Sequence, residues 1–181
     1  MNATPRWLLV VAIALLGVPA VPRAQSASDE YRLKAAFVYR FPQFVEWPAA
    51  AVRDARTLDV CVLHPNPFGT DLEQMAMGES VGGRVLRVRI VTMLEELDGC
   101  HALFAGGHNE ATAAALKAVE GLPVLTVGED DRFLDEGGII ALKVVERRVR
   151  FDVDATHARR AGLRISAQLL SLAAAVRGGT E

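Results

Sequence analysis

The chain has 181 residues, 51% of them hydrophobic, and its 20 basic and 22 acidic side chains give a formal net charge of −2. Because the balance is slightly acidic and no basic run occurs, the composition excludes nucleic acid and anionic membrane surfaces as expected partners. The length suits one domain that can bury a substantial hydrophobic core.

Residues 1–26 have the composition of a secretory signal peptide. A polar start with one positive charge precedes an apolar run at 8–21, which is shorter than the roughly 20 residues that span a bilayer. Small residues follow, and we place cleavage between Ala24 and Ala27; a membrane anchor is the alternative. No cysteine ends the run, so a lipoprotein is not expected. We therefore expect residues 27–181 to form one mature domain outside the cytoplasm.

The segment KAAFVYRFPQFVEWP, at residues 34–48, concentrates aromatic side chains near the start of this domain. Six of the eleven aromatic residues in the chain lie between Tyr31 and Trp47. Apolar residues at spacings of three and four predict a helix with one face made of Leu33, Phe37, Phe41 and Phe44. Pro42 lacks a backbone donor, so it must bend or restart this helix. Tyr39 and Trp47 lie off the face, and they either close the core or contact a partner.

Alternating and continuous apolar runs, bounded by turn residues, predict the strands that follow. The strands are expected at residues 57–63, 84–91, 100–105, 123–127, 139–145 and 148–153. Glu146 and Arg147 join the last two strands as a hairpin. The inner strands are apolar throughout, which is typical of parallel strands covered on both faces of a sheet.

Helices are indicated by residues that can cap a helix N-terminus, namely Ser28, Thr70, Thr92, Asn109, Asp130, Asp154 and Ser166. Glu73 and Glu95 follow two of these residues at the spacing of a capping box. The last helix is expected to run through Val176 and to pack against the first. The alternation of strands and helices predicts a single α/β domain. Its mainly parallel central sheet has helices on both faces and a C-terminal antiparallel hairpin at one edge.

Two cysteines, Cys61 and Cys100, lie in a part of the chain that we expect to reach an oxidising compartment. An even count there favours a disulfide over two buried free thiols. The bridge would close a loop of about 40 residues, and the chain-entropy model values such a loop at roughly 4 kcal/mol. A catalytic cysteine is less expected, because no second thiol lies nearby in the sequence to resolve it.

The sequence lacks the common motifs of catalysis and nucleotide binding: GxSxG, GxxxxGK[ST], HExxH and GxGxxG. The histidines are scattered, with His101 expected in the core and His157 in solvent. Asp152 and Asp154 face the same way, but Asp154 is explained as a helix cap. We therefore expect no catalytic residue, no cofactor and no metal site, and we do not expect an enzyme.

A second class of function stays open, in which a small ligand binds beyond the carboxyl ends of the parallel strands. Glycines and backbone amides in three loops there can hold a small anion or metabolite. The candidate residues are His64, Asn66, Gly69, Gly106, Gly107, His108, Asn109 and Glu129. The other interpretation is structural, with the glycines in tight turns and Asn109 as a helix cap.

Five segments, in order along the chain, resemble the YfiR family of periplasmic regulatory proteins. The resemblance extends over about residues 30–176. The segments read KAAFVYRFPQFVEWP, VCVLHPNPFG, CHALF, LTVGEDDRFLDEGGIIAL and VRFDVDATHARRAGLRISAQLLSLA. The resemblance implies an α/β homodimer that binds and represses the periplasmic sensor domain of an inner-membrane diguanylate cyclase. Such repression lowers cyclic di-GMP and, with it, exopolysaccharide and biofilm formation.

This chain departs from the family pattern in two places. Cys61 and Cys100 stand where one disulfide of the family falls, but the region 137–151, where some relatives have a second pair, has no cysteine. A redox-sensing role is therefore not carried over from the family. Pro42 also interrupts a segment that in relatives more often reads as an unbroken helix.

A repressor of this kind acts by binding, so its contact surface needs large apolar or aromatic anchors. We hypothesise two contact patches, one on the aromatic segment and one near the C-terminal hairpin. Their residues are Tyr39, Trp47, Phe151 and Arg164. A non-enzymatic repressor is thus the first expectation, and a small-ligand binder or enzyme that uses the strand-end loops is the alternative.

Overall fold

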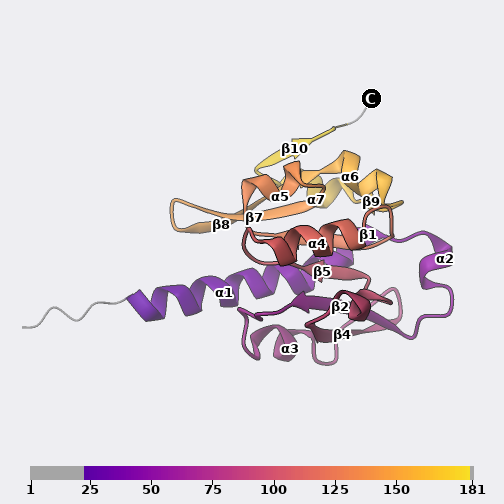
Figure 1. Ribbon diagram of the computed structural model, residues 1–181, viewed down its shortest axis with the longest axis horizontal. Coiled ribbons are helices and arrows are strands. Elements are labelled where there is room, and N and C mark those ends of the chain that lie inside the picture. The colour runs from indigo at the N-terminus through magenta and orange to yellow at the C-terminus, as the bar shows by residue number, and fades with distance from the viewer. Residues whose placement is uncertain (1–22, 180–181) are drawn as a thin grey trace, which may run out of the picture.

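The computed structural model describes residues 23–179, and the first 22 residues of the predicted signal peptide lie outside this range. No helix within the described range is both long enough and apolar enough to cross a membrane. One sheet of eight strands organises the fold, and helices cover it on both sides (Figure 1).

The sheet confirms the predicted, mainly parallel arrangement. In chain order its strands are β2 (Thr57–Leu63), β3 (Ser80–Val81), β4 (Arg84–Val91), β5 (Ala102–Phe104), β6 (Leu125–Gly128), β7 (Ile140–Val145), β8 (Arg148–Asp154) and β10 (Ala175–Arg177). They lie side by side in the order β10-β8-β7-β6-β5-β2-β4-β3. The central strands β4, β2, β5, β6 and β7 are parallel, whereas β8 pairs with β7 as the predicted antiparallel hairpin.

Two apolar cores fill the space between the sheet and its helices. The helices are α1 (Arg23–Arg40), η1 (Phe41–Phe44), α2 (Ala49–Val52), α3 (Asp71–Ala76), η2 (Leu94–Leu97), α4 (Glu110–Ala118), α5 (Asp131–Asp135), α6 (Ala155–Arg160) and α7 (Ala167–Leu172). One core includes side chains of α1, η1, α3 and α7, and the other includes side chains of η2, α4 and α5. Successive residues from Val60 to Leu63 of β2 enter opposite cores, which explains why this part of the strand is apolar on both faces.

Aromatic side chains of α1 and η1 dock this segment on the sheet, whereas Leu33 of the predicted face is 46% exposed. The ring of Phe151, on β8, has its centroid 5.2 Å from that of Phe41 and 5.9 Å from that of Phe37. Burial of such side chains stabilises a fold by roughly 1.5–3 kcal/mol each. Pro42 lies in the first turn of the 3-10 helix η1, so the predicted restart of the helix is confirmed. The chain then forms β1 (Val45–Glu46), which pairs with β9 (Arg164–Ile165) in a separate two-stranded ribbon.

The C-terminal segment differs from the predicted long helix. α7 ends at Leu172, and the residues of β10 pair in parallel with Asp152–Asp154 of β8. The prediction was wrong because apolar spacing in a short segment fits a helix and a strand alike. The open edge of β8 offers backbone partners that favour the strand. The hairpin is therefore not the edge of the sheet, and α1 packs on α3 more than on α7.

Four of the predicted helix caps are confirmed by side-chain hydrogen bonds to backbone amides: Asn109, Asp130, Asp154 and Ser166. Three predictions about side-chain caps at helix N-termini were wrong. α1 begins at Arg23, ahead of Ser28. The hydroxyl of Thr70 caps nothing and instead accepts a hydrogen bond from the side chain of Gln74. Beside Thr92, Glu96 rather than Glu95 accepts the amide hydrogens, because the following turn is a 3-10 helix that begins one residue later.

Close packing of α5 on the sheet depends on a glycine at the end of β6. A Cβ at Gly128 would overlap the ring of Phe133, which is 2% exposed. We expect Gly128→Ala to lower the free energy of unfolding by about 1–3 kcal/mol, since overpacking displaces the neighbouring side chains. Urea denaturation measures the change. Gly179→Ala, where a Cβ meets nothing within 4 Å, is the control. An equal effect of both substitutions would contradict the packing argument.

Candidate functional site

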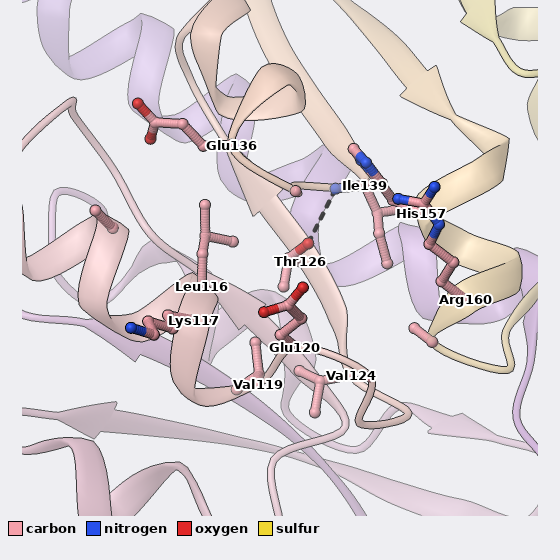
Figure 2. A pocket seen from close by; sticks show the side chains of 14 residues that line it. Leu116, Lys117, Val119, Glu120, Val124, Thr126, Glu136, Ile139, His157 and Arg160 are labelled. Carbon is pink, nitrogen blue, oxygen red and sulfur yellow. Dashed lines mark hydrogen bonds between the residues drawn. The ribbon is translucent and has the colours of Figure 1, made fainter.

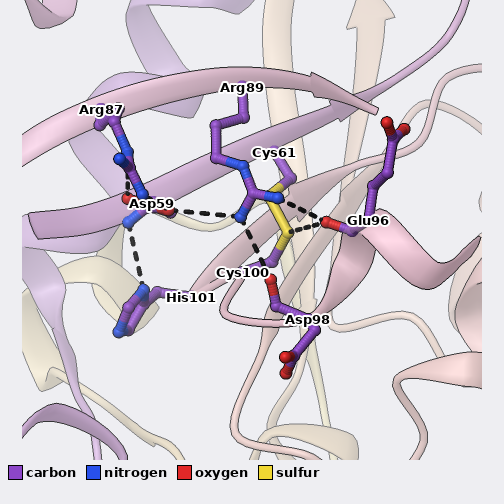
Figure 3. A network of polar contacts seen from close by, with 8 residues as sticks. All are labelled: Asp59, Cys61, Arg87, Arg89, Glu96, Asp98, Cys100 and His101. Carbon is purple, nitrogen blue, oxygen red and sulfur yellow. Dashed lines mark hydrogen bonds and ion pairs between the residues drawn. A yellow bond between two sulfur atoms is a disulfide. The ribbon is translucent and has the colours of Figure 1, made fainter. Parts of the chain in front are cut away.

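A disulfide and a buried ion-pair network lie side by side on β2, β4 and the segment before β5 (Figure 3). Cys61 lies within β2, and Cys100 lies just before β5. Parallel pairing of these two strands brings the Cα atoms of the cysteines to 5.9 Å, and the predicted disulfide is confirmed. The bridge joins residues 39 apart in sequence, a loop that the chain-entropy model values at roughly 4 kcal/mol.

Asp59 places a buried carboxylate beside this bridge, with 3% of the residue exposed. Arg87 Nε donates to Asp59 Oδ1 over 2.9 Å, and Arg87 Nη2 donates to Oδ2 over 2.5 Å. Arg89 Nη1 donates to the same Oδ2 over 3.3 Å. A carboxylate out of water needs such partners, because an unpaired buried charge is strongly destabilising. The pairing therefore fixes the orientation of both arginines along β4.

Arg89 also holds the loop that carries Cys100. Its Nη2 donates to the carbonyl oxygen of Glu96 over 2.7 Å, and its Nη1 donates to the carbonyl oxygen of Asp98 over 3.2 Å. The carboxylate of Glu96 accepts hydrogen bonds from the amides of Thr92 and Met93. The loop is thus fixed at one end by the disulfide and along its length by the guanidinium group.

The charge state of this network is constant near neutral pH. Arg87 and Arg89 hold the pKa of Asp59 below its ordinary value, although burial by itself raises it. Burial lowers the pKa of His101, so its ring is neutral at pH 7. The amide of Asp59 donates to His101 Nδ1 over 3.1 Å, which leaves the ring proton on Nε2. The carboxylate of Asp59 is held charged and the ring of His101 is held neutral, which suits a structural role better than proton transfer.

Asp59, Arg87 and Arg89 are not among the predicted site residues, although the sequence has a signal for them. Asp59 is the single charge inside the apolar strand TLDVCVL, and the two arginines alternate in RVLRVRIV. A charge in the middle of a buried strand requires a partner of opposite sign. The arginines of the predicted strand at 84–91 are candidates for that partner.

The β1–β9 ribbon brings two predicted contact residues together. Arg164, with a side chain 83% exposed, has its Nη1 3.4 Å from Oε2 of Glu46 on the opposite strand. Trp47 follows directly and is half-buried. Its Nε1 donates to the carbonyl oxygen of His101 over 3.3 Å, and its ring meets the His101 ring edge-on. Trp47 therefore packs on the core and also keeps part of its ring in solvent.

The other two predicted contact residues have different surroundings. Phe151 is 3% exposed and packs on Phe37 and Phe41, so its side chain offers no surface to a partner, contrary to the hypothesis. The pleat of β8 turns this residue toward α1, while its neighbour Arg150 is exposed. Tyr39 is half-buried on α1, and the guanidinium carbon of Arg40 lies 5.3 Å from the centre of its ring.

The loops beyond β2 and β5 flank the point where the strand order reverses, and the loop beyond β6 lies next to them. Several of their side chains already have partners within the protein. Asn66 accepts from the amide of Phe68 and donates to the carbonyl oxygen of Gly69. Asn109 caps α4. Gly69 and Gly107 have positive φ angles, as tight turns require. His108 Nδ1 lies 3.3 Å from the carboxylate of Glu136, and His64 is exposed. Gly106 lies against Glu129, the remaining candidate.

Lys34, on α1, occupies this edge of the sheet and pairs with Glu129. Its Nζ lies 2.6 Å from Glu129 and 2.5 Å from Glu30, and the residue is 6% exposed. Burial by itself lowers the pKa of Lys34, but hydrogen bonds to the two carboxylates hold it above its ordinary value. The hydroxyl of Tyr31 also donates to Glu129 over 3.4 Å. Glu129, predicted to bind a ligand, therefore has an internal cation as its partner.

A cavity of about 350 Å³ lies away from these loops, between α4, α6 and the turn before β7 (Figure 2). Its apolar wall includes Leu116, Val124 and Ile139. The buried hydroxyl of Thr126 accepts a hydrogen bond from the amide of Ile139 over 2.9 Å. Charged and titratable side chains surround the apolar wall: Lys117, Glu120, Glu136, His157 and Arg160. Among residues 23–179, no three His, Cys, Asp or Glu side chains are grouped to hold a metal ion.

Comparisons with known proteins connect the chain to one family. The family model described as YfiR/HmsC-like matches residues 31–174. None of the curated proteins matches the chain. A conserved domain protein from Vibrio cholerae O1 biovar El Tor is 9% identical, with a TM-score of 0.49 over 81% of this chain and 60% of that one. An ABC domain in complex with L-Trp, from Streptococcus pneumoniae, is also 9% identical, with a TM-score of 0.51 over 78% and 60%.

The chain spans 60% of the length of each of these two solved structures. At 9% identity, the likeness to the second structure concerns the fold alone. The match to the family model, by contrast, runs from within α1 to beyond the end of α7. It therefore includes both the disulfide and the β1–β9 ribbon.

The Asp59 network predicts a dependence of stability on pH. The pKa of Asp59 is lower in the folded protein than in the unfolded chain, so the unfolded chain binds the proton more readily. The stabilisation is complete above the unfolded value of about 4 and is lost as the pH falls through the folded value. We expect Asp59→Asn to lower the free energy of unfolding at pH 7 by about 1–3 kcal/mol. The variant should also lose less stability than wild type between pH 7 and pH 3.

Urea denaturation at several pH values measures both effects. Asp54→Asn, which removes an exposed carboxylate from the loop before β2, is the matched control. An Asp59→Asn profile parallel to that of wild type down to pH 3 would show that the carboxylate is not stabilised by Arg87 and Arg89.

Proposed function

Because this chain belongs to the YfiR/HmsC-like family, we propose that it represses a membrane diguanylate cyclase by binding the periplasmic sensor domain of that enzyme. The family suggests a periplasmic regulator of cyclic di-GMP signalling. Repression lowers cyclic di-GMP and therefore biofilm formation. The proposed activity is protein binding, and the proposed location is the periplasm, reached through the predicted signal peptide.

The observation that carries this proposal is the family match over residues 31–174, which includes nearly all of the described fold. The arrangement of the residues agrees with binding rather than catalysis. The carboxylate of Asp59 is paired with Arg87 and Arg89, and the carboxylate of Glu129 is paired with Lys34. The β1–β9 ribbon meanwhile offers a partly exposed tryptophan next to an exposed arginine, Trp47 and Arg164. Both residue types are enriched among the energetically dominant residues of protein interfaces.

Repression requires that the chain bind the inactive form of the cyclase more tightly than the active form. A ligand with equal affinity for two states shifts nothing. Moving the cyclase from mostly active to mostly inactive takes roughly 5 kcal/mol of differential affinity. Exposed ion pairs such as Arg164 with Glu46 contribute little of this. Aromatic anchors, here Trp47 and in part Tyr39, are therefore the proposed source. A homodimer, implied by the family resemblance, stays a prediction.

Deletion of the gene tests the proposed function in the cell. We expect higher cyclic di-GMP and stronger surface attachment, because the cyclase loses its repressor. Complementation with the wild-type gene should restore the original level. Unchanged cyclic di-GMP in a strain that expresses a membrane diguanylate cyclase with a periplasmic sensor domain would contradict the proposal.

Trp47→Ala tests the contact surface. We expect the affinity for the periplasmic domain of the cyclase to fall by about 2 kcal/mol, roughly 30-fold, and cyclic di-GMP to rise part of the way to the deletion level. Trp47 also packs on His101, so thermal unfolding of the variant must accompany the titration. Trp47→Phe, which keeps most of the ring but not the Nε1 donor, is the control. Wild-type affinity in a folded Trp47→Ala variant would remove Trp47 from the interface.

A second candidate function is the binding of a small molecule, and the cavity between α4 and α6 favours it. A volume of about 350 Å³ with an apolar wall, a buried hydroxyl and charged groups around it suits a compact amphipathic ligand. The strand-end loops remain the alternative place for such a ligand. Thermal unfolding with a panel of small metabolites is the test, and a ligand of the cavity should raise the melting temperature. Ala161→Phe, which narrows the cavity, should abolish that shift, whereas a shift that persists would point to the loops.

A further inference from the structure

An apolar groove of about 610 Å³ lies between α2, η2 and the segment that follows α4. Its walls include Ala51 and Ala55 on one side, Leu94 on a second and Leu122 with Pro123 on a third. These residues come from three separate parts of the chain. The groove shares Val119 and Val124 with the cavity between α4 and α6, and no residue of the β1–β9 ribbon lines it.

Large apolar side chains are exposed along this groove. Leu94 is 42% exposed and Leu122 is 50% exposed, and both line it. Met93, next to Leu94 in the chain, does not line the groove itself but is 59% exposed beside it. Single apolar residues on a surface are ordinary, but a gathering of them around a concave site marks a place of interaction.

The formal charges that line the groove are acidic. Glu95 and Asp98 are its charged residues, and both are exposed. Neither carboxylate forms an ion pair with a residue in the described part of the chain. His101, which also lines the groove, is neutral at pH 7 because burial lowers its pKa. The groove therefore presents an apolar surface beside two negative charges that have no cation of their own.

The groove is held in shape before anything binds. Cys100 lines it and is joined to Cys61 by the disulfide. Arg89 donates hydrogen bonds to the carbonyl oxygens of Glu96 and Asp98. These bonds fix the backbone of the segment that carries the groove residues Glu95 and Asp98. A preformed site loses less conformational entropy on binding than one that must order its loops.

We propose that this groove binds a segment of the partner protein in which a bulky apolar side chain stands next to a lysine or arginine. The apolar side chain enters between Leu94 and Leu122, and the cation lies over Glu95 and Asp98. The groove reaches the ribbon through His101, whose carbonyl oxygen accepts the hydrogen bond from Trp47, so one partner can contact both surfaces. This inference rests on the proposed function, since the partner is the periplasmic domain of the cyclase.

The test titrates the purified periplasmic domain of a membrane diguanylate cyclase from the same organism into the purified mature chain. Two groove variants are compared with wild type: Leu122→Ser and the charge reversal Glu95→Lys/Asp98→Lys. We expect Leu122→Ser to weaken binding by about tenfold or more, because it removes an exposed apolar wall. The reversal should weaken binding as strongly and should also reduce the salt dependence seen with wild type.

Each variant has a matched control on a different part of the surface. Leu172→Ser changes a leucine that is 60% exposed on α7. Glu73→Lys/Glu79→Lys makes the same change in net charge as the reversal, at exposed positions in and after α3. Both controls should bind within about twofold of wild type. Thermal unfolding of all four variants shows that the substituted side chains, which are exposed, leave the fold intact.

The outcomes separate this inference from the proposed function. If wild type binds the cyclase domain and the groove variants bind equally well, the groove proposal is wrong and the repressor function stands. If Leu122→Ser changes the mass of the chain in light scattering but not its affinity for the cyclase, the groove binds a second copy of this chain and the proposal is equally wrong. If wild type does not bind the cyclase domain and deletion leaves cyclic di-GMP unchanged, both fail together.

Discussion

The buried ammonium group of Lys34 determines where the first helix lies. A cation that is 6% exposed must have a partner of opposite charge, and Glu129, just after β6, provides it. This pair ties α1 to the segment after β6, and the aromatic side chains of α1 and η1 pack on the sheet. The chain then restarts at Pro42 and enters β1, which sets the position of Trp47 on the ribbon. The candidate contact surface therefore depends on an ion pair that is remote from it.

The sequence predicted those elements that neighbouring residues decide. β2 and β4 begin and end where the apolar patterns predict them, and the hairpin turn falls on Glu146 and Arg147, both with positive φ. Short segments with ambiguous spacing were not predictable in this way. β10 forms because β8 offers it an open edge, and nothing inside Ala175–Arg177 distinguishes a strand from the end of a helix.

The candidate site was predictable only in part, for a related reason. The disulfide followed from the number of cysteines and the expected compartment. The partial exposure of Trp47 followed from its place off the apolar face. The burial of Phe151 and the pairing of Lys34 depend on contacts between distant residues, which no local pattern specifies. The groove is built from three separate segments, so no local sequence motif predicts it. Charged residues inside apolar runs were the one signal of these long-range contacts that the sequence contained.

The separation of Lys34 from Glu129 has a consequence for the order in which the chain assembles. The two residues are 95 apart in sequence, so α1 is synthesised long before its ionic partner. Phe37 and Phe41 are equally early, whereas Phe151, on which they pack, comes late. Contacts between remote residues slow folding, and exposed apolar surface favours aggregation until they form. The element made first is thus among the last to reach its native environment, and until then its aromatic face must be kept from other chains.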